Sequence, residues 1–146
     1  MTSIVVVDFG MGNLRSVAKA FEHVAPKSMV RISGDVSVIR SADRVVLPGQ
    51  GAIGGYVKAL HDTDIEPAVL EAAQSKPFLG ICLGQQVLYE SSDEHGEDGD
   101  SVTTLGLFKG KVKHFTHVSS DPQAMIDPHT GHQYTIPHMG WNQVQQ

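Results

Sequence analysis

The segment PFLGICLGQQVLYE, residues 77–90, predicts a buried strand, a sharp turn and a helix in direct succession. Its opening apolar run is typical of a strand in a parallel sheet, because such strands are covered on both faces. Glycines flank Cys82, the only cysteine of the chain, where the strand ends. A residue on such a turn lies at the carboxyl edge of the sheet, where α/β folds bind ligands. The segment therefore predicts an α/β fold with Cys82 at its ligand-binding edge.

Further predicted strands precede this segment and alternate with helices. SIVVVDF (3–9) is β-branched and apolar, and SMVRI (28–32) and RVVLPG (44–49) are shorter strands. A helix-rich span follows to about residue 74, with Pro67 near the first turn of its second part. Alternating strands and helices favour a doubly wound sheet.

The first predicted helix starts after Asn13, which is a good N-cap residue. Its apolar residues recur at helical spacing and predict a buried face. They are Leu14, Val17, Ala18, Phe21 and Val24.

The pattern changes after Glu90. The acidic stretch 91–104 predicts a solvated loop. Residues 106–118 and 132–144 look like strands of a small antiparallel part. We therefore expect a three-layer, doubly wound α/β fold with a mostly parallel sheet and a small antiparallel part, forming one domain over residues 1–146.

Composition excludes several classes of function. The chain has 146 residues and a formal net charge of −5, which argues against a nucleic-acid or anionic-membrane binder. A single cysteine cannot form an internal disulfide, and it fits a reducing compartment. Neither a signal peptide nor a membrane-spanning run is evident, so a cytoplasmic location is expected.

Cys82 has two interpretations. A free cysteine is often a buried and inert core residue. On a G-x-C-x-G turn before a helix, however, the thiol would be exposed and strained, and the helix N-terminus would favour the reactive thiolate. The backbone N–H of Leu83 would then stabilise an oxyanion. We favour the nucleophile.

The segment 77–90 resembles the nucleophile segment of class I, triad-type glutamine amidotransferases. VVDFGMGNLRSVAKAFE (6–22), VLPGQGAIGGYVKAL (46–60) and IPHMGWNQV (136–144) resemble motifs of one branch of that family, the glutaminase subunits of imidazole glycerol phosphate synthase. Together these segments span almost the whole chain in order.

The resemblance implies a reaction and its site residues. Cys82 would attack the glutamine amide, release ammonia and form a thioester. The N–H groups of Gln50 and Leu83 would form the oxyanion hole. Gly49, Gly51 and Gln86 would bind the glutamine. The simpler alternative for residues 48–51 is a plain turn. No cofactor or metal is implied.

The resemblance also implies a protein partner. The glutaminase would form a heterodimer with a barrel-shaped cyclase subunit, through which the ammonia would pass. Asn13, Met139 and Trp141 would lie toward this cyclase. Core packing is the alternative for Trp141.

The family's triad is completed by a later His-x-Glu motif, which we expect to be absent from this chain. Five histidines follow residue 113, and none has an acid two residues later. They are His114, His117, His129, His132 and His138, followed by Thr116, Ser119, Gly131, Tyr134 and Gly140. We therefore expect a C-terminally truncated chain with impaired turnover, in which His138 has a packing role.

Several alternatives stay open. The chain could be a non-catalytic module that only binds the cyclase, or another Cys-elbow amidotransferase or hydrolase of the α/β class. GMGNLR lacks the third glycine of a dinucleotide fingerprint, at Arg15. His129 and His132 with Asp121 and Asp127 have no standard metal-site spacing.

Overall fold

The computed structural model describes residues 1–95, 100–119, 121–128 and 130–136. The chain divides into two compact units, Met1–Val112 and Lys113–Gln146. The predicted site residues up to Gln86 all belong to the first unit.

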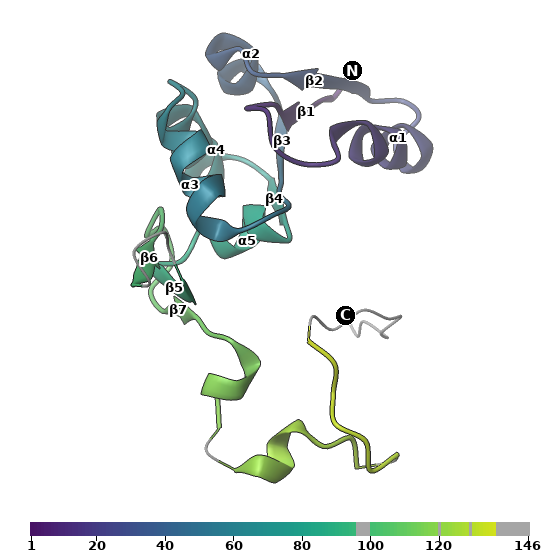
Figure 1. Ribbon diagram of the computed structural model, residues 1–146. Helices are drawn as coiled ribbons and strands as arrows, with labels where there is room; N and C mark the ends of the chain where they lie inside the picture. The colour runs from purple at the N-terminus through teal and green to yellow at the C-terminus, as the bar shows by residue number, and fades with distance from the viewer. Residues whose placement is uncertain (96–99, 120, 129, 137–146) are drawn as a thin grey trace. The chain divides into compact units, whose positions relative to one another are not determined.

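A four-stranded parallel sheet forms the centre of the first unit (Figure 1). Its strand order is β2-β1-β3-β4, and every neighbouring pair is parallel. The strands are β1 (Ser3–Val7), β2 (Met29–Ser33), β3 (Arg44–Pro48) and β4 (Phe78–Ile81). All four predicted strands of the parallel sheet are confirmed.

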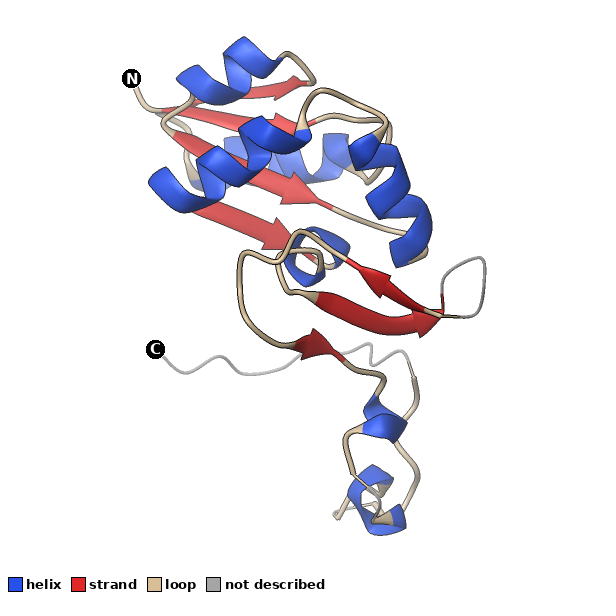
Figure 2. Cartoon of the chain, turned by 90° about the vertical axis from the view of Figure 1, so that its left-hand side faces the viewer, coloured by secondary structure: helices blue, strands red, loops and turns tan. Residues whose placement is uncertain are grey.

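Helices cover both faces of this sheet, as the doubly wound prediction requires (Figure 2). They are α1 (Leu14–Val24), α2 (Val36–Ser41), α3 (Ile53–His61) and α4 (Glu66–Ser75). Asn13 caps α1 as predicted, because its side chain accepts a hydrogen bond from the N–H of Ser16. Helix α2 was not predicted from the sequence, although its N-cap Asp35 accepts hydrogen bonds from two backbone N–H groups.

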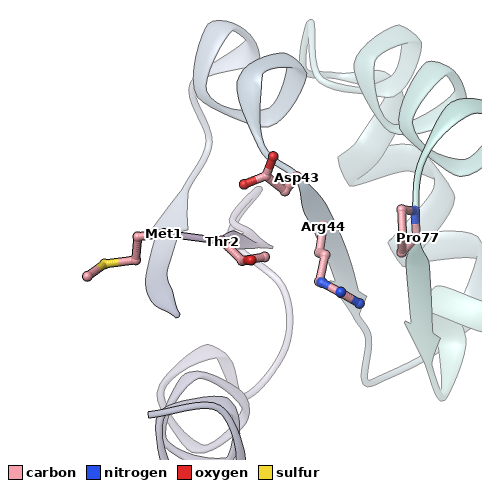
Figure 3. Close-up of a pocket in the computed structure, with 5 residues that line it drawn as sticks. All are labelled: Met1, Thr2, Asp43, Arg44 and Pro77. Atoms are coloured by element: carbon pink, nitrogen blue, oxygen red, sulfur yellow. The ribbon is translucent and has the colours of Figure 1, made fainter. Parts of the chain in front are cut away.

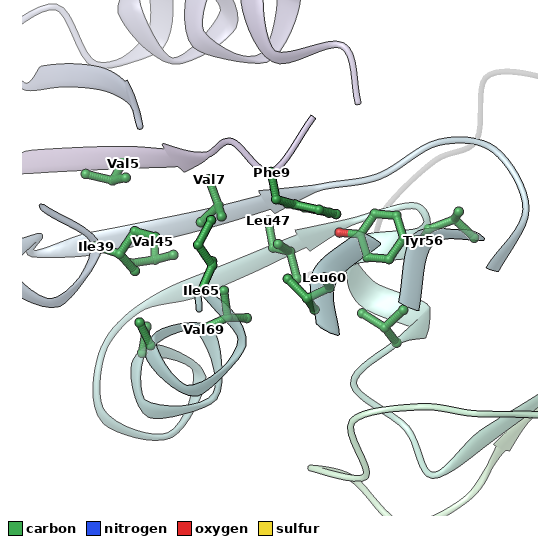
Figure 4. Packing of buried hydrophobic residues seen from close by; sticks show 14 of the residues in the cluster. Val5, Val7, Phe9, Ile39, Val45, Leu47, Tyr56, Leu60, Ile65 and Val69 are labelled. Atoms are coloured by element: carbon green, nitrogen blue, oxygen red, sulfur yellow. The ribbon is translucent and has the colours of Figure 1, made fainter. Parts of the chain in front are cut away.

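Alternate residues of each strand form two separate hydrophobic clusters. Val5, Val7, Val45 and Leu47 pack with α2, α3, α4 and the start of the next helix (Figure 4). On the opposite face a small buried cluster lies against α1, and it consists of Ile4, Val6, Ala18 and Val46. Leu14, Val17 and Phe21 join it as predicted, whereas Val24 is 73% exposed and its predicted burial is wrong.

The helix after Cys82 is shorter than predicted. It is a single turn, α5 (Leu83–Gln86), and not a helix through Glu90. The carbonyls of Val87, Leu88 and Tyr89 instead accept hydrogen bonds from N–H groups of the loop 105–108. These long-range bonds take the place of the next helical turn.

The acidic stretch 91–104 is not simply a loop, so this prediction is wrong. It contains β5 (Ser91–His95) and β6 (Ser101–Thr103), which pair antiparallel, and β7 (Lys111–Val112) pairs parallel with β5. Ser92 is buried and Val102 packs against the larger core cluster. Packing on the core therefore overrides the polar composition, and the small sheet is mixed and not purely antiparallel.

The described part of the second unit contains little regular structure. It has two 3₁₀ turns, η1 (Phe115–His117) and η2 (Pro122–Met125), and an isolated bridge between Ile126 and Gln133. The strand predicted over 106–118 is reduced to β7. Of the strand predicted over 132–144, the described part contributes only this bridge.

Candidate active site

The carboxyl ends of β3 and β4 bring the two central motifs together. Pro48 pairs with Ile81 across these parallel strands. Gly49 directly follows β3 and Cys82 directly follows β4, so both leave the sheet at the same edge. This is the edge at which α/β folds bind ligands, as the sequence predicted.

Cys82 has the strained backbone of a nucleophile turn. Its φ of 55° and ψ of −119° lie outside the common regions, and it is the one non-glycine residue with positive φ in the described ranges. Its side chain is exposed. The interpretation of Cys82 as a buried core residue is therefore wrong. Strain of this kind concentrates at functional sites.

Close backbone contacts explain the glycines around Cys82. A Cβ on Gly80 would lie 2.6 Å from the Cα of Gln85, and one on Gly84 would overlap the Leu47 carbonyl. The turn therefore folds back on β4 and rests against β3. Only glycine at both positions allows this approach, which holds Cys82 at the sheet edge.

Gly49 makes the corresponding contact from β3. A Cβ there would lie 2.6 Å from the N of Gly84, 2.7 Å from the Cβ of Leu83 and 2.8 Å from Cε2 of Tyr56. The segment that carries Gln50 is thus packed directly against the start of α5. A plain solvent-exposed turn would not need this contact.

Backbone hydrogen bonds join the Cys82 turn to α5. The N–H groups of Gln85 and Gln86 donate to the Cys82 carbonyl, at 3.0 and 3.1 Å. Leu83 is the first helical residue, where an N–H has no partner within the helix. Because α5 is one turn long, it supplies less macrodipole to the sulfur than the longer predicted helix would.

The remaining predicted residues of the first unit lie at or near the same edge. Gln50 is exposed, and Gly51 has a φ of 96° that favours glycine. The β1–α1 loop reaches this segment, because a Cβ on Gly12 would contact the Pro48 side chain at 3.4 Å. Asn13 follows directly and is exposed.

One buried polar residue at this edge was not predicted. The Tyr56 hydroxyl donates a 2.8 Å hydrogen bond to the Pro48 carbonyl. Burial and then the nearby Cys82 raise the pKa of this phenol. A tyrosine on the buried face of a helix needs a partner for its hydroxyl, and this was the available signal.

The structure does not assign a general base. His114 and His117 lie close together in the second unit, with ring centroids 5.5 Å apart. His129, His138, Met139 and Trp141 lie outside the described residues. One triplet with His-x-Glu spacing does follow Cys82 and was overlooked, namely His95-Gly96-Glu97, whose glutamate also lies outside the described residues.

One hollow away from this edge is lined by neither a cysteine nor a histidine. A cavity of about 350 Å³ is lined by Met1, Thr2, Asp43, Arg44 and Pro77 (Figure 3). These residues lie at the amino ends of the strands, opposite Cys82. Within the described ranges, no cluster of three or more His, Cys, Asp or Glu residues could hold a metal ion. The described helices are also too short or too polar to cross a membrane.

Comparison with known proteins agrees with the geometry at Cys82. The chain is similar to imidazole glycerol phosphate synthase subunit HisH of Nitrosospira multiformis, with 47% identity over 146 residues, 100% of this chain and 64% of the relative. The HisH subunit of Nitrosomonas europaea is 49% identical over 146 residues, with the same two coverages. That of Dechloromonas aromatica is 47% identical over 144 residues, 99% of this chain and 62% of the relative.

The chain thus spans somewhat less than two thirds of the length of these relatives. The family Glutamine amidotransferase class-I matches residues 5–146, which include the Pro48–Gly51 segment and the Cys82 turn. The chain belongs to the class-I glutamine amidotransferase family.

Proposed function

We propose that this chain is the glutaminase part of an imidazole glycerol phosphate synthase, and that it acts in histidine biosynthesis in the cytoplasm. The observation that carries the proposal is the strained, exposed Cys82 beside the glycine-lined end of β3. The names of the similar HisH subunits support the choice of synthase.

The proposed reaction uses Cys82 as the nucleophile. Its sulfur attacks the side-chain amide carbon of glutamine, and the carbonyl oxygen becomes an oxyanion. The N–H groups of Leu83 and Gln50 stabilise this oxyanion. The C–N bond then breaks, ammonia leaves with the thiol proton, and water hydrolyses the thioester to glutamate. Gly49, Gly51 and Gln86 bind the glutamine.

A cyclase subunit is the proposed partner and recipient of the ammonia. Asn13 lies at the carboxyl edge of the sheet, where α1 begins, and it would contact this subunit together with Met139 and Trp141. We expect the chain to co-purify with the cyclase subunit of Nitrosospira multiformis. Trp141→Ala should weaken this association. Unchanged tight binding would instead indicate that Trp141 packs in the core.

Turnover by the 146-residue polypeptide is expected to be low even with the cyclase. Cys82 needs a base to take its proton and return it to ammonia, and the structure assigns no histidine to this role. Loss of a triad member typically lowers the rate by about four to six orders of magnitude. The non-catalytic binding module is therefore the second candidate function.

Ammonia release from glutamine, measured with saturating cyclase, separates the two functions. A glutaminase should show slow release that Cys82→Ser abolishes, and a binding module should show none. His95→Gln serves as the matched control for the one His-x-Glu triplet after Cys82. A loss of release in that variant would assign His95 as the base, and release by Cys82→Ser would exclude the proposed nucleophile.

A further inference from the structure

We propose that Tyr56 is a positioning residue for the oxyanion hole. Its hydroxyl holds the Pro48 carbonyl, and its ring holds Gly49, so that the next peptide can present the Gln50 N–H beside Cys82. This inference rests on the proposed glutaminase function, and it adds a residue outside the thiol and the two oxyanion donors.

The hydrogen bond of Tyr56 helps to hold residues 49–52, the segment that carries the proposed oxyanion donor Gln50. Tyr56 lies in the first turn of α3, and its N–H donates to the Ala52 carbonyl at 3.0 Å. Its hydroxyl donates to the Pro48 carbonyl at 2.8 Å. Residues 49–52 are therefore fixed at both ends to the same helical turn.

The ring of Tyr56 is itself held firmly. The residue has no exposed surface, and its ring meets Phe9 edge to face with centroids 4.9 Å apart (Figure 4). A hydroxyl on a buried and immobilised ring is a well-defined anchor, because few rotamers are available to it.

Gly49 lies between this ring and the start of the nucleophile helix. A Cβ on Gly49 would come within 2.8 Å of both Tyr56 Cε2 and Leu83 Cβ. Tyr56 therefore sets the distance between the two proposed oxyanion donors, Gln50 on one segment and Leu83 on the other.

The anchored carbonyl restricts how the Gln50 N–H can turn. The Pro48–Gly49 peptide plane is fixed by its bond to Tyr56, so only rotation at Gly49 and Gln50 can reorient the next peptide. Without the hydroxyl, the Pro48–Gly49 and Gly49–Gln50 peptide planes could rotate together. The Gln50 N–H would then sample more orientations. A preorganised donor stabilises the oxyanion better than a mobile one.

The hydroxyl keeps its proton over the working pH range. Burial, with a smaller contribution from Cys82, raises the pKa of Tyr56. The group thus stays a donor even when Cys82 is a thiolate.

Two reagents that both label Cys82 test this role on the 146-residue chain. A γ-chloromethyl ketone analogue of glutamine forms an oxyanion when the thiolate adds to its ketone, whereas iodoacetamide reacts without one. The readout is the ratio of the two second-order labelling rates. Tyr56→Phe should lower this ratio about tenfold while the iodoacetamide rate is retained.

Two control variants separate positioning from stability. Tyr89→Phe removes a hydroxyl from a half-buried tyrosine beyond α5 and should leave the ratio unchanged. Phe9→Leu removes the ring partner of Tyr56 but keeps its hydroxyl. It should lower the urea midpoint, and the ratio should fall less than in Tyr56→Phe because the hydroxyl remains.

The outcomes separate the positioning role of Tyr56 from the proposed glutaminase function. A ratio in Tyr56→Phe within about twofold of the unmodified chain overturns the role of Tyr56 and leaves the glutaminase function standing. If the unmodified chain shows no preference for the glutamine analogue, or the analogue labels Cys82→Ser equally, both proposals fail.

A second route applies if Tyr56→Phe does not fold. The chain has three tyrosines, so Tyr89→Phe with Tyr134→Phe leaves Tyr56 as the last one. Growth on 3-fluorotyrosine then makes its hydroxyl a stronger donor without removing it. The labelling ratio should rise, and an unchanged ratio would overturn the proposal.

Discussion

The two faces of the four-stranded sheet differ in how completely they are covered. On the face toward α2, α3 and α4, Val45 and Leu47 are almost fully buried. On the face toward α1, Leu79 of β4 is 48% exposed, and a cavity of about 140 Å³ lies beside it, lined in part by Phe21 and Val46. Parallel sheets are normally covered on both faces. Because the face toward α1 is less completely covered here, stability should come mainly from the face toward α2, α3 and α4.

Leu47→Ala should produce the largest loss of stability. Leu47 has no exposed surface, and its side chain packs against the Gly84 turn. Truncating such a residue should lower the free energy of unfolding by about 2–5 kcal/mol. Urea denaturation followed by circular dichroism measures this, and a loss of less than about 1 kcal/mol would show that this face is not the main core.

Phe21→Ala probes the other face at its better-covered part. Phe21 of α1 is partly buried against Ile4, Val6 and Val46. Because its ring is only partly removed from water, the expected loss is about 1–2 kcal/mol, smaller than that of Leu47→Ala. The same urea titration measures this loss. A larger loss in Phe21→Ala than in Leu47→Ala would contradict the comparison of the two faces.

Leu79→Ala is the matched counterpart of Leu47→Ala, on the neighbouring strand and the open face. Since about half of the side chain is already exposed, stability should change by less than about 1 kcal/mol. Leu79→Lys should also reduce light scattering at high protein concentration, because it interrupts an exposed apolar surface. A large destabilisation would mean that something covers this face in solution.

Asp35→Ala tests the attachment of α2 to the well-covered face and should have the smallest effect. Hydrogen bonds from the Ser37 side chain and from the backbone N–H groups of Ser37 and Val38 lower the pKa of Asp35. A lowered pKa in the folded state stabilises the protein above the unfolded carboxyl pKa, and this contribution is lost as the pH falls through the folded pKa. The difference between Asp35→Ala and the unmodified chain should therefore be present at pH 7 and vanish in acid. An equal difference at pH 7 and in acid would show that the charge of Asp35 does not contribute to stability.

The parallel sheet could be predicted from sequence because its strands are short, β-branched and apolar. The Cys82 turn could be predicted because its glycines have a specific steric function. Errors arose where long-range contacts decide local structure. The loop 105–108 ends α5 early, and packing of Ser92 and Val102 turns an acidic stretch into strands. The bond between Tyr56 and Pro48 was missed because composition and periodicity predict burial, but not the partner of a hydroxyl.

The most direct test of the central claim is the rate at which iodoacetamide labels Cys82 in the presence and absence of glutamine, followed by mass spectrometry of the labelled peptide. The exposed thiol should be labelled readily in the folded chain, and glutamine should slow the labelling because it occupies the same edge of the sheet. Asparagine, one methylene shorter, should protect much less. A labelling rate that is indifferent to glutamine would contradict the account, since Cys82 would then not lie in a glutamine site.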